Sequence, residues 1–236
     1  MDLDPRSLGV FVVTSADPAG RGHLDVASAA LEGGATALQL RAPELEDEAL
    51  LPLASGLAAR CRDAGVLFVV NDRVEVALAS GADGVHVGQG DDPAHARHRL
   101  GSGLVLGISV GGPAEAEAAQ RAGADYLGVT VWATATKPEA RPHGLEGVRE
   151  VVAATPLPVV GIGGITPENA ASVLRAGAAG VAVISAVAAA GDPVEAVREL
   201  RRLVDREGGE RGAGERGARE RGVGGERGAG GERAHG

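Results

Sequence analysis

Apolar and polar positions change their period repeatedly along this chain. Short apolar runs typical of strands alternate eight times with stretches in which apolar residues recur at helical spacing. We expect strands at residues 10–14, 37–41, 67–71, 84–87, 105–110, 126–130, 158–162 and 180–184. We expect helices at residues 25–32, 46–64, 74–79, 94–99, 114–122, 145–153, 167–175 and 193–204.

The repetition of one strand–helix unit narrows the fold class. The strand runs are apolar on both faces, as in a parallel sheet that helices cover. Eight such units favour an α/β fold with a single closed (β/α)8 barrel of the TIM type, which we assign to residues 1–205 as a catalytic domain. The alternative is an open doubly wound sheet, but no Gly-x-Gly-x-x-Gly sequence follows the first strand run.

The C-terminal segment, residues 206–236, differs in kind. It consists almost entirely of Gly, Glu, Arg and Ala, and Val223 is its one aliphatic residue larger than Ala. Such a segment buries too little apolar surface to offset the entropy of ordering, so we predict a disordered tail. Its Arg and Glu residues nearly balance, which argues against an arm that binds nucleic acid.

Composition narrows the set of partners further. The net charge of −9 indicates no surface for polyanions, and no apolar run reaches membrane-spanning length. The N-terminus lacks the basic-then-apolar pattern of a signal peptide, so we expect a cytoplasmic protein. The single cysteine, Cys61, lies in an amphipathic helix pattern, which indicates a packing role. We expect small-molecule ligands, no nucleic acid and no membrane, and the sequence leaves room for a homo-oligomer.

Two strand runs are followed by carboxylates. Asp72 comes directly after the run 67–71, and Asp91 follows the run 84–87 after a short Gly-containing stretch. Ligands of α/β proteins bind at the carboxyl ends of the strands, and hard divalent cations prefer oxygen donors. Asp72 and Asp91 are therefore candidate ligands of one divalent ion. The alternative for each residue is an N-cap of the following helix.

A glycine-rich turn follows the seventh strand run. Gly163 and Gly164 precede Pro167, which opens a helix. Backbone N–H groups and a helix N-terminus suit an anion, and barrels of this type often hold phosphate after the seventh and eighth strands. Ile184 and Ser185 at the end of the eighth run add N–H groups and a hydroxyl. Two tight turns without a ligand are the alternative.

The second strand run ends on two polar side chains. Gln39 and Arg41 are spaced so that both lie on one face of this strand. An arginine can bind a phosphate through two parallel hydrogen bonds, and a glutamine can recognise an amide-like or aminopyrimidine edge. An ion pair of Arg41 with Glu44 or Glu46 is the alternative.

Further polar groups belong to later strand runs. Ser109 ends the fifth run and can either donate to a phosphate or cap the next helix. Thr134, Thr136 and Lys137 lie close together in the loop after the sixth run, and Lys137 is the one lysine of the chain. Such a group of donors suits an anion clamp. His86, inside the fourth run, is either a satisfied core residue or part of the site.

In this order, the motifs resemble those of the thiamine-phosphate synthase family. The similar region spans residues 10–204, and a glycine-rich segment shared by many phosphate-binding barrels is only one part of it. The segments that carry the resemblance are Gln39-Leu-Arg41, Val70-Asn71-Asp72, His86-Val-Gly-Gln89-Gly-Asp91, Gly107-Ile-Ser109, Thr134-Ala-Thr136-Lys137, Gly161-Ile-Gly-Gly-Ile165 and Ile184-Ser185. The ordered set with Asn-Asp and Gly-Gln-x-Asp is specific.

The resemblance implies a transferase of thiamine diphosphate biosynthesis. It would join 4-amino-2-methyl-5-(diphosphomethyl)pyrimidine to 4-methyl-5-(2-phosphoethyl)thiazole and release diphosphate and thiamine phosphate. The implied route is a dissociative substitution assisted by Mg²⁺, through a pyrimidinylmethyl cation. The resemblance implies that Asp72 and Asp91 bind Mg²⁺ and that Gln39 contacts the pyrimidine. The implied diphosphate ligands are Arg41, Asn71, Ser109 and Lys137. The implied ligands of the thiazole phosphate are Thr134, Thr136, Gly164, Ile184 and Ser185. Among these, Arg41, Ser109 and Lys137 would be catalytic.

The chain departs from the family pattern at two places. Pro43 stands where the family usually has a lysine, and the loss of this cation should weaken diphosphate binding or slow its departure. The loop after the sixth strand run is one residue shorter than usual and contains Trp132 in place of a tyrosine. We expect its aromatic face beside the pyrimidine, where it could stabilise a cation.

Three other functions are compatible with parts of this pattern. A thiazole tautomerase on the same barrel would need a proton-transfer residue, but both aspartates are present and no histidine follows Ser109 closely. A non-catalytic binder of the thiazole phosphate could have lost its clamp through Pro43. A sugar-phosphate isomerase would leave the Thr-x-Thr-Lys sequence unexplained.

Overall fold

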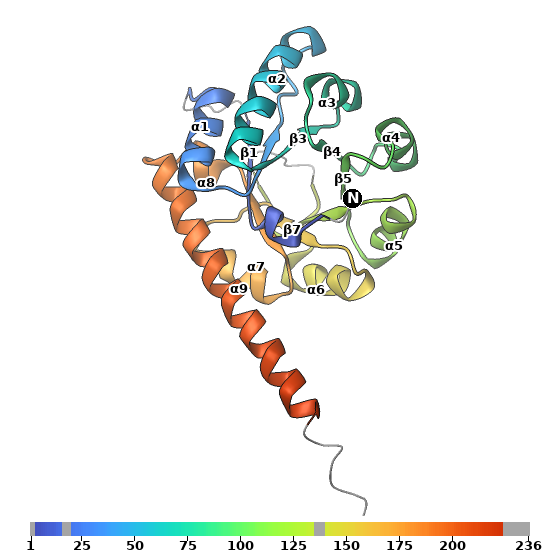
Figure 1. The fold of residues 1–236 in the computed structure, drawn as a ribbon, viewed down its shortest axis with the longest axis vertical. Helices are drawn as coiled ribbons and strands as arrows, with labels where there is room; N and C mark the ends of the chain where they lie inside the picture. The colour runs from blue at the N-terminus through green and yellow to red at the C-terminus, as the bar shows by residue number, and fades with distance from the viewer. Residues whose placement is uncertain (1–2, 16–19, 135–139, 224–236) are drawn as a thin grey trace, which may run out of the picture.

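Eight parallel strands form a closed barrel in the order β1 to β8, as the computed structural model shows (Figure 1). The model describes residues 3–15, 20–134 and 140–223, with side chains to residue 209. The strands are β1 (Val10–Val13), β2 (Ala37–Leu40), β3 (Leu67–Asn71), β4 (Gly84–Val87), β5 (Val105–Ser109), β6 (Tyr126–Thr130), β7 (Val159–Ile162) and β8 (Gly180–Val183). The predicted (β/α)8 barrel is therefore confirmed, and the open sheet is excluded.

Helices surround this barrel on the outside (Figure 1). They are α1 (His23–Gly33), α2 (Asp47–Ala64), α3 (Val74–Ser80), α4 (Pro93–Leu100), α5 (Pro113–Arg121), α6 (Gly144–Ala154), α7 (Pro167–Arg175), α8 (Ser185–Ala188) and α9 (Pro193–Val223). A short 3₁₀ helix, η1 (Pro5–Leu8), precedes β1. The sequence pattern did not predict η1 or α8, because each has only four residues and shows no helical period.

The last helix continues further than the pattern predicts. Residues 206–223 belong to α9, in which Glu, Arg and Ala favour a helix and six glycines oppose it. The side chain of Glu207 is buried and accepts a hydrogen bond from Arg175 Nη1 at 2.8 Å. The packed part of the chain therefore extends beyond the boundary predicted at residue 205. Residues 224–236 of the predicted tail lie outside the described residues.

Residues just before the even-numbered strands stabilise the N-terminal end of the barrel. Thr36 Oγ1 accepts the backbone N–H of Val10 at 2.9 Å. Asp83 and Asp125 do the same for β3 and β5, since their Oδ2 atoms accept the N–H groups of Phe68 at 2.8 Å and Leu106 at 2.7 Å. Val10 is the first residue of its strand, and Phe68 and Leu106 are the second residues of theirs, so each side chain satisfies a strand N–H at this end of the barrel.

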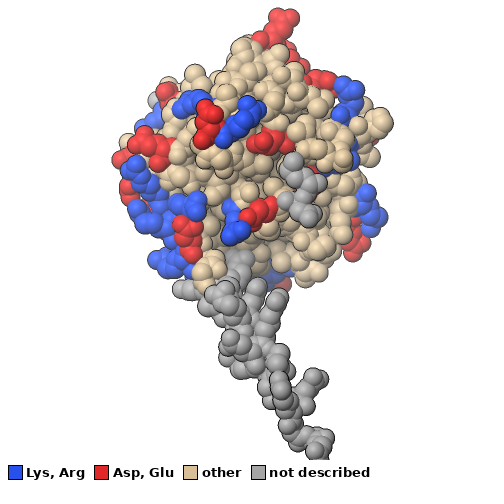
Figure 2. Space-filling view, viewed as in Figure 1, with Lys and Arg blue, Asp and Glu red and all other residues tan. Residues whose placement is uncertain are grey.

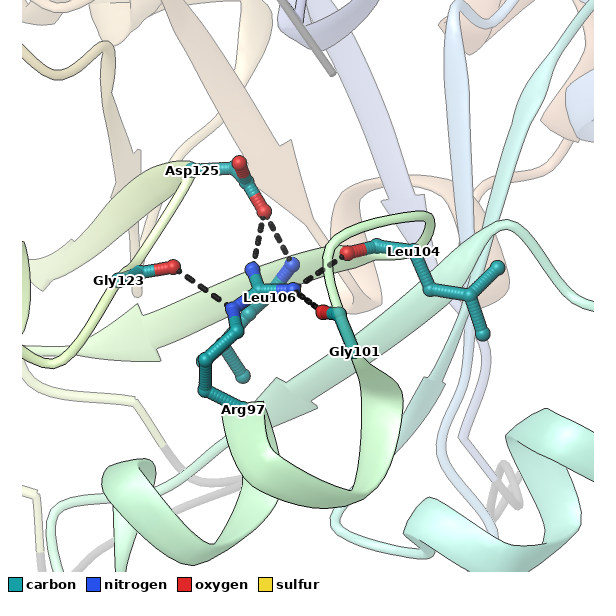
Figure 3. Close-up of polar contacts among 6 residues, drawn as sticks. All are labelled: Arg97, Gly101, Leu104, Leu106, Gly123 and Asp125. Carbon is teal, nitrogen blue, oxygen red and sulfur yellow. Dashed lines mark hydrogen bonds and ion pairs between the residues drawn. The ribbon is translucent and has the colours of Figure 1, made fainter.

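Arg97 of α4 completes the most extensive of these networks (Figure 3). Its Nη2 donates to Asp125 Oδ2 at 2.6 Å, so this carboxylate binds both a guanidinium and a strand N–H. The other guanidinium nitrogens donate to the carbonyl oxygens of Gly101, Leu104 and Gly123. One side chain thus ties together α4 and the loops before β5 and β6.

Side chains that face the barrel interior change from apolar to polar along the strands. Every second residue of a strand faces inward, because side chains alternate between the two faces. On β2 this series runs from Ala37 through Gln39 to Arg41, which follows the strand. On β3 it runs from Val69 to Asn71. The interior is therefore a packed apolar core near the N-terminal ends and a polar cavity near the C-terminal ends.

Two further expectations concern the packing of Cys61 and the surface of the molecule. Cys61 lies on α2 and is fully buried, which confirms its predicted packing role. Burial raises the pKa of its thiol to about 12. Acidic and basic side chains lie interspersed on the face of the molecule that Figure 2 shows. Over the described part of the chain, no helix combines the length and apolar content of a membrane span.

Candidate active site

A cavity opens at the C-terminal end of the barrel, where TIM-type enzymes bind their ligands. It is lined from strands on every side of the barrel, which brings residues distant in sequence around one space. The predicted site residues among its lining are Gln39, Arg41, Asn71, Ser109, Thr134, Gly164, Ile184 and Ser185. Thr136 and Lys137 fall outside the described residues, so their predicted clamp role stays a prediction.

Gln39 and Arg41 reach the cavity from the end of β2. Gln39 is buried, and its neighbour along the same inward face, Arg41, is half-buried. The backbone N–H of Arg41 donates to Thr14 Oγ1 at 3.2 Å, which fixes the point where the chain leaves the strand. The guanidinium is therefore placed beside the cavity by two neighbouring strands.

Glu44, in the loop beyond Arg41, forms a hydrogen-bonded pair with His23 at the start of α1. His23 Nδ1 contacts Thr14 Oγ1 at 2.9 Å, and His23 Nε2 contacts Glu44 Oε1 at 2.7 Å. Partial burial is the largest single influence on Glu44 and works against its ionisation. The hydrogen bond from His23, a backbone hydrogen bond and the charges of His23 and Arg41 together outweigh it, so the pKa of Glu44 lies below its ordinary value. Glu44, one alternative partner proposed for Arg41, thus forms its close contact with His23.

Asp72 follows β3 in an unusual backbone conformation. Its φ is 60°, and it is the one described non-glycine residue with positive φ. Asn71 Nδ2 donates to Asp72 Oδ2 at 2.5 Å, and the N–H of Asp72 donates to the carbonyl of His86 on β4. The N-cap position of α3 belongs to Arg73, so Asp72 does not cap this helix. A conformation that costs energy in a carboxylate residue, at a strand end, favours a functional role.

Asp91 lies in the loop after the neighbouring strand β4. Its Oδ2 accepts the N–H of Gly88 at 2.8 Å, which folds the carboxylate over its own loop. The cap of α4 is the next residue, Asp92, whose Oδ1 accepts the N–H groups of Ala94 and His95. The capping alternative is therefore wrong for Asp91 as it is for Asp72.

Asp72 and Asp91 offer the oxygen donors that Mg²⁺ prefers, but they do not surround a closed metal site. Both Asp72 and Asp91 are exposed, and neither contributes to the lining of the cavity itself. The described residues contain no cluster of three or more His, Cys, Asp or Glu side chains that could hold a metal. Two carboxylates would be enough for Mg²⁺ in a phosphate-transfer site, where the substrate's phosphate oxygens and water supply the other ligands. The hydrogen bond from Asn71 fixes the orientation of one carboxylate.

A tight glycine turn forms the opposite side of the cavity. Gly163 and Gly164 after β7 have φ values of 92° and 63°, which strongly favour glycine. A Cβ at Gly163 would lie 2.7 Å from the carbonyl oxygen of Trp132, so the turn packs directly on the loop after β6. Helix α7 starts shortly after the turn, at Pro167. The turn can therefore present backbone N–H groups to an anion near a helix N-terminus.

Trp132, in the loop after β6, was expected to place its aromatic ring beside the pyrimidine, but it does not line the cavity. Its backbone N–H donates to the carbonyl oxygen of Gly163 at 3.3 Å, and its side chain packs against the hydrophobic core between strands and helices. The expected aromatic face is therefore not found in the described lining of the cavity, because β6 ends at Thr130 and the inward alternation of the strand does not continue to Trp132.

Tyr126 contributes an aromatic ring to the cavity, beside that of Phe11, and the sequence analysis did not select it as a site residue. It occupies the first inward position of β6, and its ring contacts Phe11 and His86 with centroid distances of 5.9 and 5.5 Å. Burial raises the pKa of the phenol above its ordinary value, so the hydroxyl keeps its proton. Gly107 on the paired strand β5 was the sequence signal for this position, because a glycine there leaves the space that the ring fills.

Tyr126, His86 and Ser109 form a chain of hydrogen bonds across three strands. His86 Nδ1 lies 3.0 Å from the hydroxyl of Tyr126, and His86 Nε2 lies 2.9 Å from Ser109 Oγ. All three residues line the cavity. Helix α5 has its N-cap at Gly112, so Ser109 does not cap it. His86 is thus satisfied at both ring nitrogens and also belongs to the site.

The fold and this cavity together define a class of protein, the TIM-barrel enzymes that act on phosphorylated ligands. Within this class, the chain matches the family model described as thiamine monophosphate synthase over residues 10–187 and belongs to this family. The resemblance inferred from the motifs is confirmed, and with it the predicted activity class, a transferase of the thiamine-phosphate synthase type.

Individual relatives agree with the family assignment. The chain is 50% identical over 202 residues to a thiamine-phosphate synthase from Moorella thermoacetica, covering 84% of this chain and 96% of the relative. It is 50% identical over 195 residues to one from Roseiflexus castenholzii, covering 81% and 86% of the two chains. A solved structure of thiamine phosphate pyrophosphorylase from Pyrococcus furiosus superimposes with a TM-score of 0.80 at 40% identity, covering 86% of this chain and 98% of that one.

Proposed function

We propose that this chain joins 4-amino-2-methyl-5-(diphosphomethyl)pyrimidine to 4-methyl-5-(2-phosphoethyl)thiazole and releases diphosphate. The observation that carries this proposal is the pairing of two different anion-binding sides around one cavity. Arg41, Asn71 and Ser109 lie on one side, and the turn at Gly163 and Gly164 lies on the other. A reaction between a diphosphate and a monophosphate substrate needs both sides at once.

The side of Arg41 suits the diphosphate. An arginine fork, an amide and a hydroxyl offer several N–H and O–H donors to anionic oxygens. Departure of diphosphate concentrates negative charge on these oxygens, and donors that are already oriented stabilise that charge most. Lys137 is proposed to add a second cation to this side from the loop after β6. Pro43, which stands where the family resemblance implies a lysine, is exposed and carries no charge.

The other sides of the cavity suit the remaining parts of the substrates. Gln39 is proposed to hydrogen-bond the aminopyrimidine edge, and the glycine turn with Ile184 and Ser185 is proposed to bind the thiazole phosphate, which is supported by their positions in the cavity lining. Phe11, Val13 and Tyr126 form the apolar floor beneath them. A pyrimidinylmethyl cation reacts with water, so a floor that excludes water favours capture by the thiazole nitrogen.

Mg²⁺ is proposed as the cofactor, with Asp72 and Asp91 as its ligands. When bound, the ion would neutralise charge on the diphosphate and so support its departure. The protein's part is to present two carboxylates at the ends of adjacent strands, one of them oriented by Asn71. Small molecules are the proposed partners, while a homo-oligomeric state and a cytoplasmic location stay predictions.

The test is a product assay with every component varied singly. Purified protein is incubated with the pyrimidine diphosphate, the thiazole phosphate and Mg²⁺, and thiamine phosphate is followed by chromatography. We expect product only when all three are present. Release of diphosphate without the thiazole would indicate hydrolysis of the cation, and binding of both ligands without any product would favour a non-catalytic binder.

Asp91 provides the sharpest test of the metal assignment. Asp91→Ala should abolish turnover at low Mg²⁺, whereas Asp92→Ala, one residue away, should only weaken the cap of α4. A calorimetric titration of Mg²⁺ in the presence of diphosphate gives a readout that does not depend on turnover. Equal Mg²⁺ affinity in wild type and Asp91→Ala would remove Asp91 from the metal site.

A further inference from the structure

The hydrogen-bonded series Tyr126–His86–Ser109 leads from the apolar core of the barrel to the polar cavity. The hydroxyl of Tyr126 is buried beneath the cavity, and His86 is its hydrogen-bond partner within the described part of the chain. Two glycines make room for the rings: a Cβ at Gly107 would lie 2.1 Å from Tyr126 Cζ, and one at Gly128 would lie 3.2 Å from His86 Cε1. Interior space is thus reserved for this polar chain where side chains would normally fill the barrel.

The buried phenol determines which ring nitrogen of His86 carries the proton. If Nδ1 were protonated, it would donate to the phenol oxygen, and no described protein group would accept the buried phenol proton. An unsatisfied buried donor is costly, so Tyr126 donates to an unprotonated Nδ1. A neutral imidazole then carries its proton on Nε2, and this N–H donates to Ser109 Oγ.

The direction of these hydrogen bonds determines whether Ser109 presents a proton or a lone pair to the cavity. A hydroxyl oxygen that accepts from His86 is free to turn its own proton toward a ligand. With the other tautomer, Ser109 would donate to His86 and would present a lone pair, which repels an anion. The tautomer of His86 therefore sets the sign of the interaction between Ser109 and a phosphate oxygen.

We propose that His86 is a positioning residue, which Tyr126 holds in the Nε2–H tautomer so that Ser109 is a hydrogen-bond donor to the departing diphosphate. This inference rests on the proposed function for the identity of the anion. It assigns no proton transfer to His86, which contacts Ser109 rather than the substrate. The roles of His86 and Tyr126 are to orient one donor before the substrate arrives.

The tautomer can be measured without any turnover. In ¹⁵N-labelled protein near neutral pH, two-bond proton–nitrogen correlations distinguish the two neutral tautomers and the cation. The His86 signal is assigned by its loss in His86→Gln. We expect a single Nε2–H tautomer in wild type and a mixture in Tyr126→Phe, which keeps the ring but loses the hydroxyl. An Nδ1–H tautomer in wild type would overturn the proposal.

A matched pair of amides separates positioning from packing. In His86→Gln the amide N–H can reach the place of Nε2, whereas in His86→Asn the shorter amide lies near Nδ1 and leaves Ser109 without its donor. We expect kcat to fall about 100-fold in His86→Asn and less than about 10-fold in His86→Gln, with KM nearly unchanged, since removal of one oriented donor costs about 10²–10³ in rate. Equal losses in both variants would indicate a packing role only.

A double-mutant cycle tests whether His86 acts through Ser109. In a Ser109→Ala background, Tyr126→Phe and His86→Asn should cause little further loss, because the donor that they orient is already absent. Full additivity would overturn the proposal. Thermal unfolding of each variant controls for folding. Wild-type turnover in the same assay tests the proposed function separately, and the tautomer measurement remains decisive even if that turnover is absent.

Discussion

The two ends of the barrel use polar residues in opposite ways. At the N-terminal end, Asp125 and Arg97 bind one another and the backbone around them, so their hydrogen-bonding groups are directed at the protein itself. At the C-terminal end, Gln39, Arg41 and Ser109 face a cavity. The same barrel therefore separates stabilising polar contacts from those directed at a ligand.

This separation shows how position along a strand decides a residue's role. A carboxylate one residue before a strand, such as Asp83, accepts the N–H of the neighbouring strand. A carboxylate just after a strand, such as Asp72, lies where the chain turns away and takes a left-handed conformation. Both types follow from the parallel arrangement, because all strands begin at one end of the barrel and finish at the other.

The largest effect should come from Arg41→Ala at the C-terminal end. We expect turnover to fall about 10²–10³-fold, because an oriented donor to the leaving diphosphate is lost. The free energy of unfolding should change by less than about 0.5 kcal/mol, as for a typical surface substitution. Steady-state kinetics and urea unfolding measure the two quantities, and Arg41→Lys should retain an intermediate rate. A large loss of stability would contradict the separation of the two ends.

Asp125→Ala should have the reverse profile. The substitution leaves the N–H of Leu106 and the guanidinium of Arg97 without their carboxylate, which should lower the free energy of unfolding by about 2–3 kcal/mol. Turnover per folded molecule should stay at the wild-type level. Urea unfolding followed by circular dichroism gives the first quantity. A rate loss without a stability loss would show that this end influences the site.

Asp83→Ala is a matched comparison with a smaller expected effect. Asp83 accepts the N–H of Phe68 as Asp125 accepts that of Leu106, but no ion pair between Asp83 and an arginine is recorded within the described residues. We expect a loss of about 1–2 kcal/mol, the cost of one unsatisfied donor. The difference between the two variants then measures the contribution of Arg97. Equal losses would show that the guanidinium adds nothing.

Glu44→Gln should give the smallest effect and tests an exception at the C-terminal end. The pKa of Glu44 is lowered on folding, so its pair with His23 stabilises the fold above the ordinary value of 4.5, and this contribution is lost as the pH falls through the lowered value. The carboxylate is partly exposed, so we expect less than about 1 kcal/mol at neutral pH. Unfolding curves of both proteins should converge in acid.

Strand positions could be predicted closely because the apolar runs are short, regular and bounded by turns. The predicted run 67–71 and the strand β3 coincide, and the other seven strands differ from their runs by one residue at most. The short helix α8 and the length of α9 could not be predicted, since four residues carry no period and a Gly/Glu/Arg composition suits both coil and helix.

The site could be predicted only in part from the sequence. Residues at strand ends, such as Arg41 and Ser109, were identifiable because the barrel directs these ends toward one cavity. The contact between His86 and Tyr126 joins β4 to β6 across a strand that carries Gly107, and this depends on barrel closure. The position of Trp132 outside the cavity lining depends on loop geometry that its sequence does not reveal.

Closure of the barrel has a consequence for synthesis on the ribosome. Strand β1 pairs with β2 on one side and with β8 on the other, so Val10 meets Val181. The first strand to leave the ribosome therefore has an unpaired edge until almost the whole domain has emerged. Contacts between residues so far apart slow folding, and an exposed edge invites pairing with other chains. One edge of β1 therefore stays available for pairing until β8 has been made.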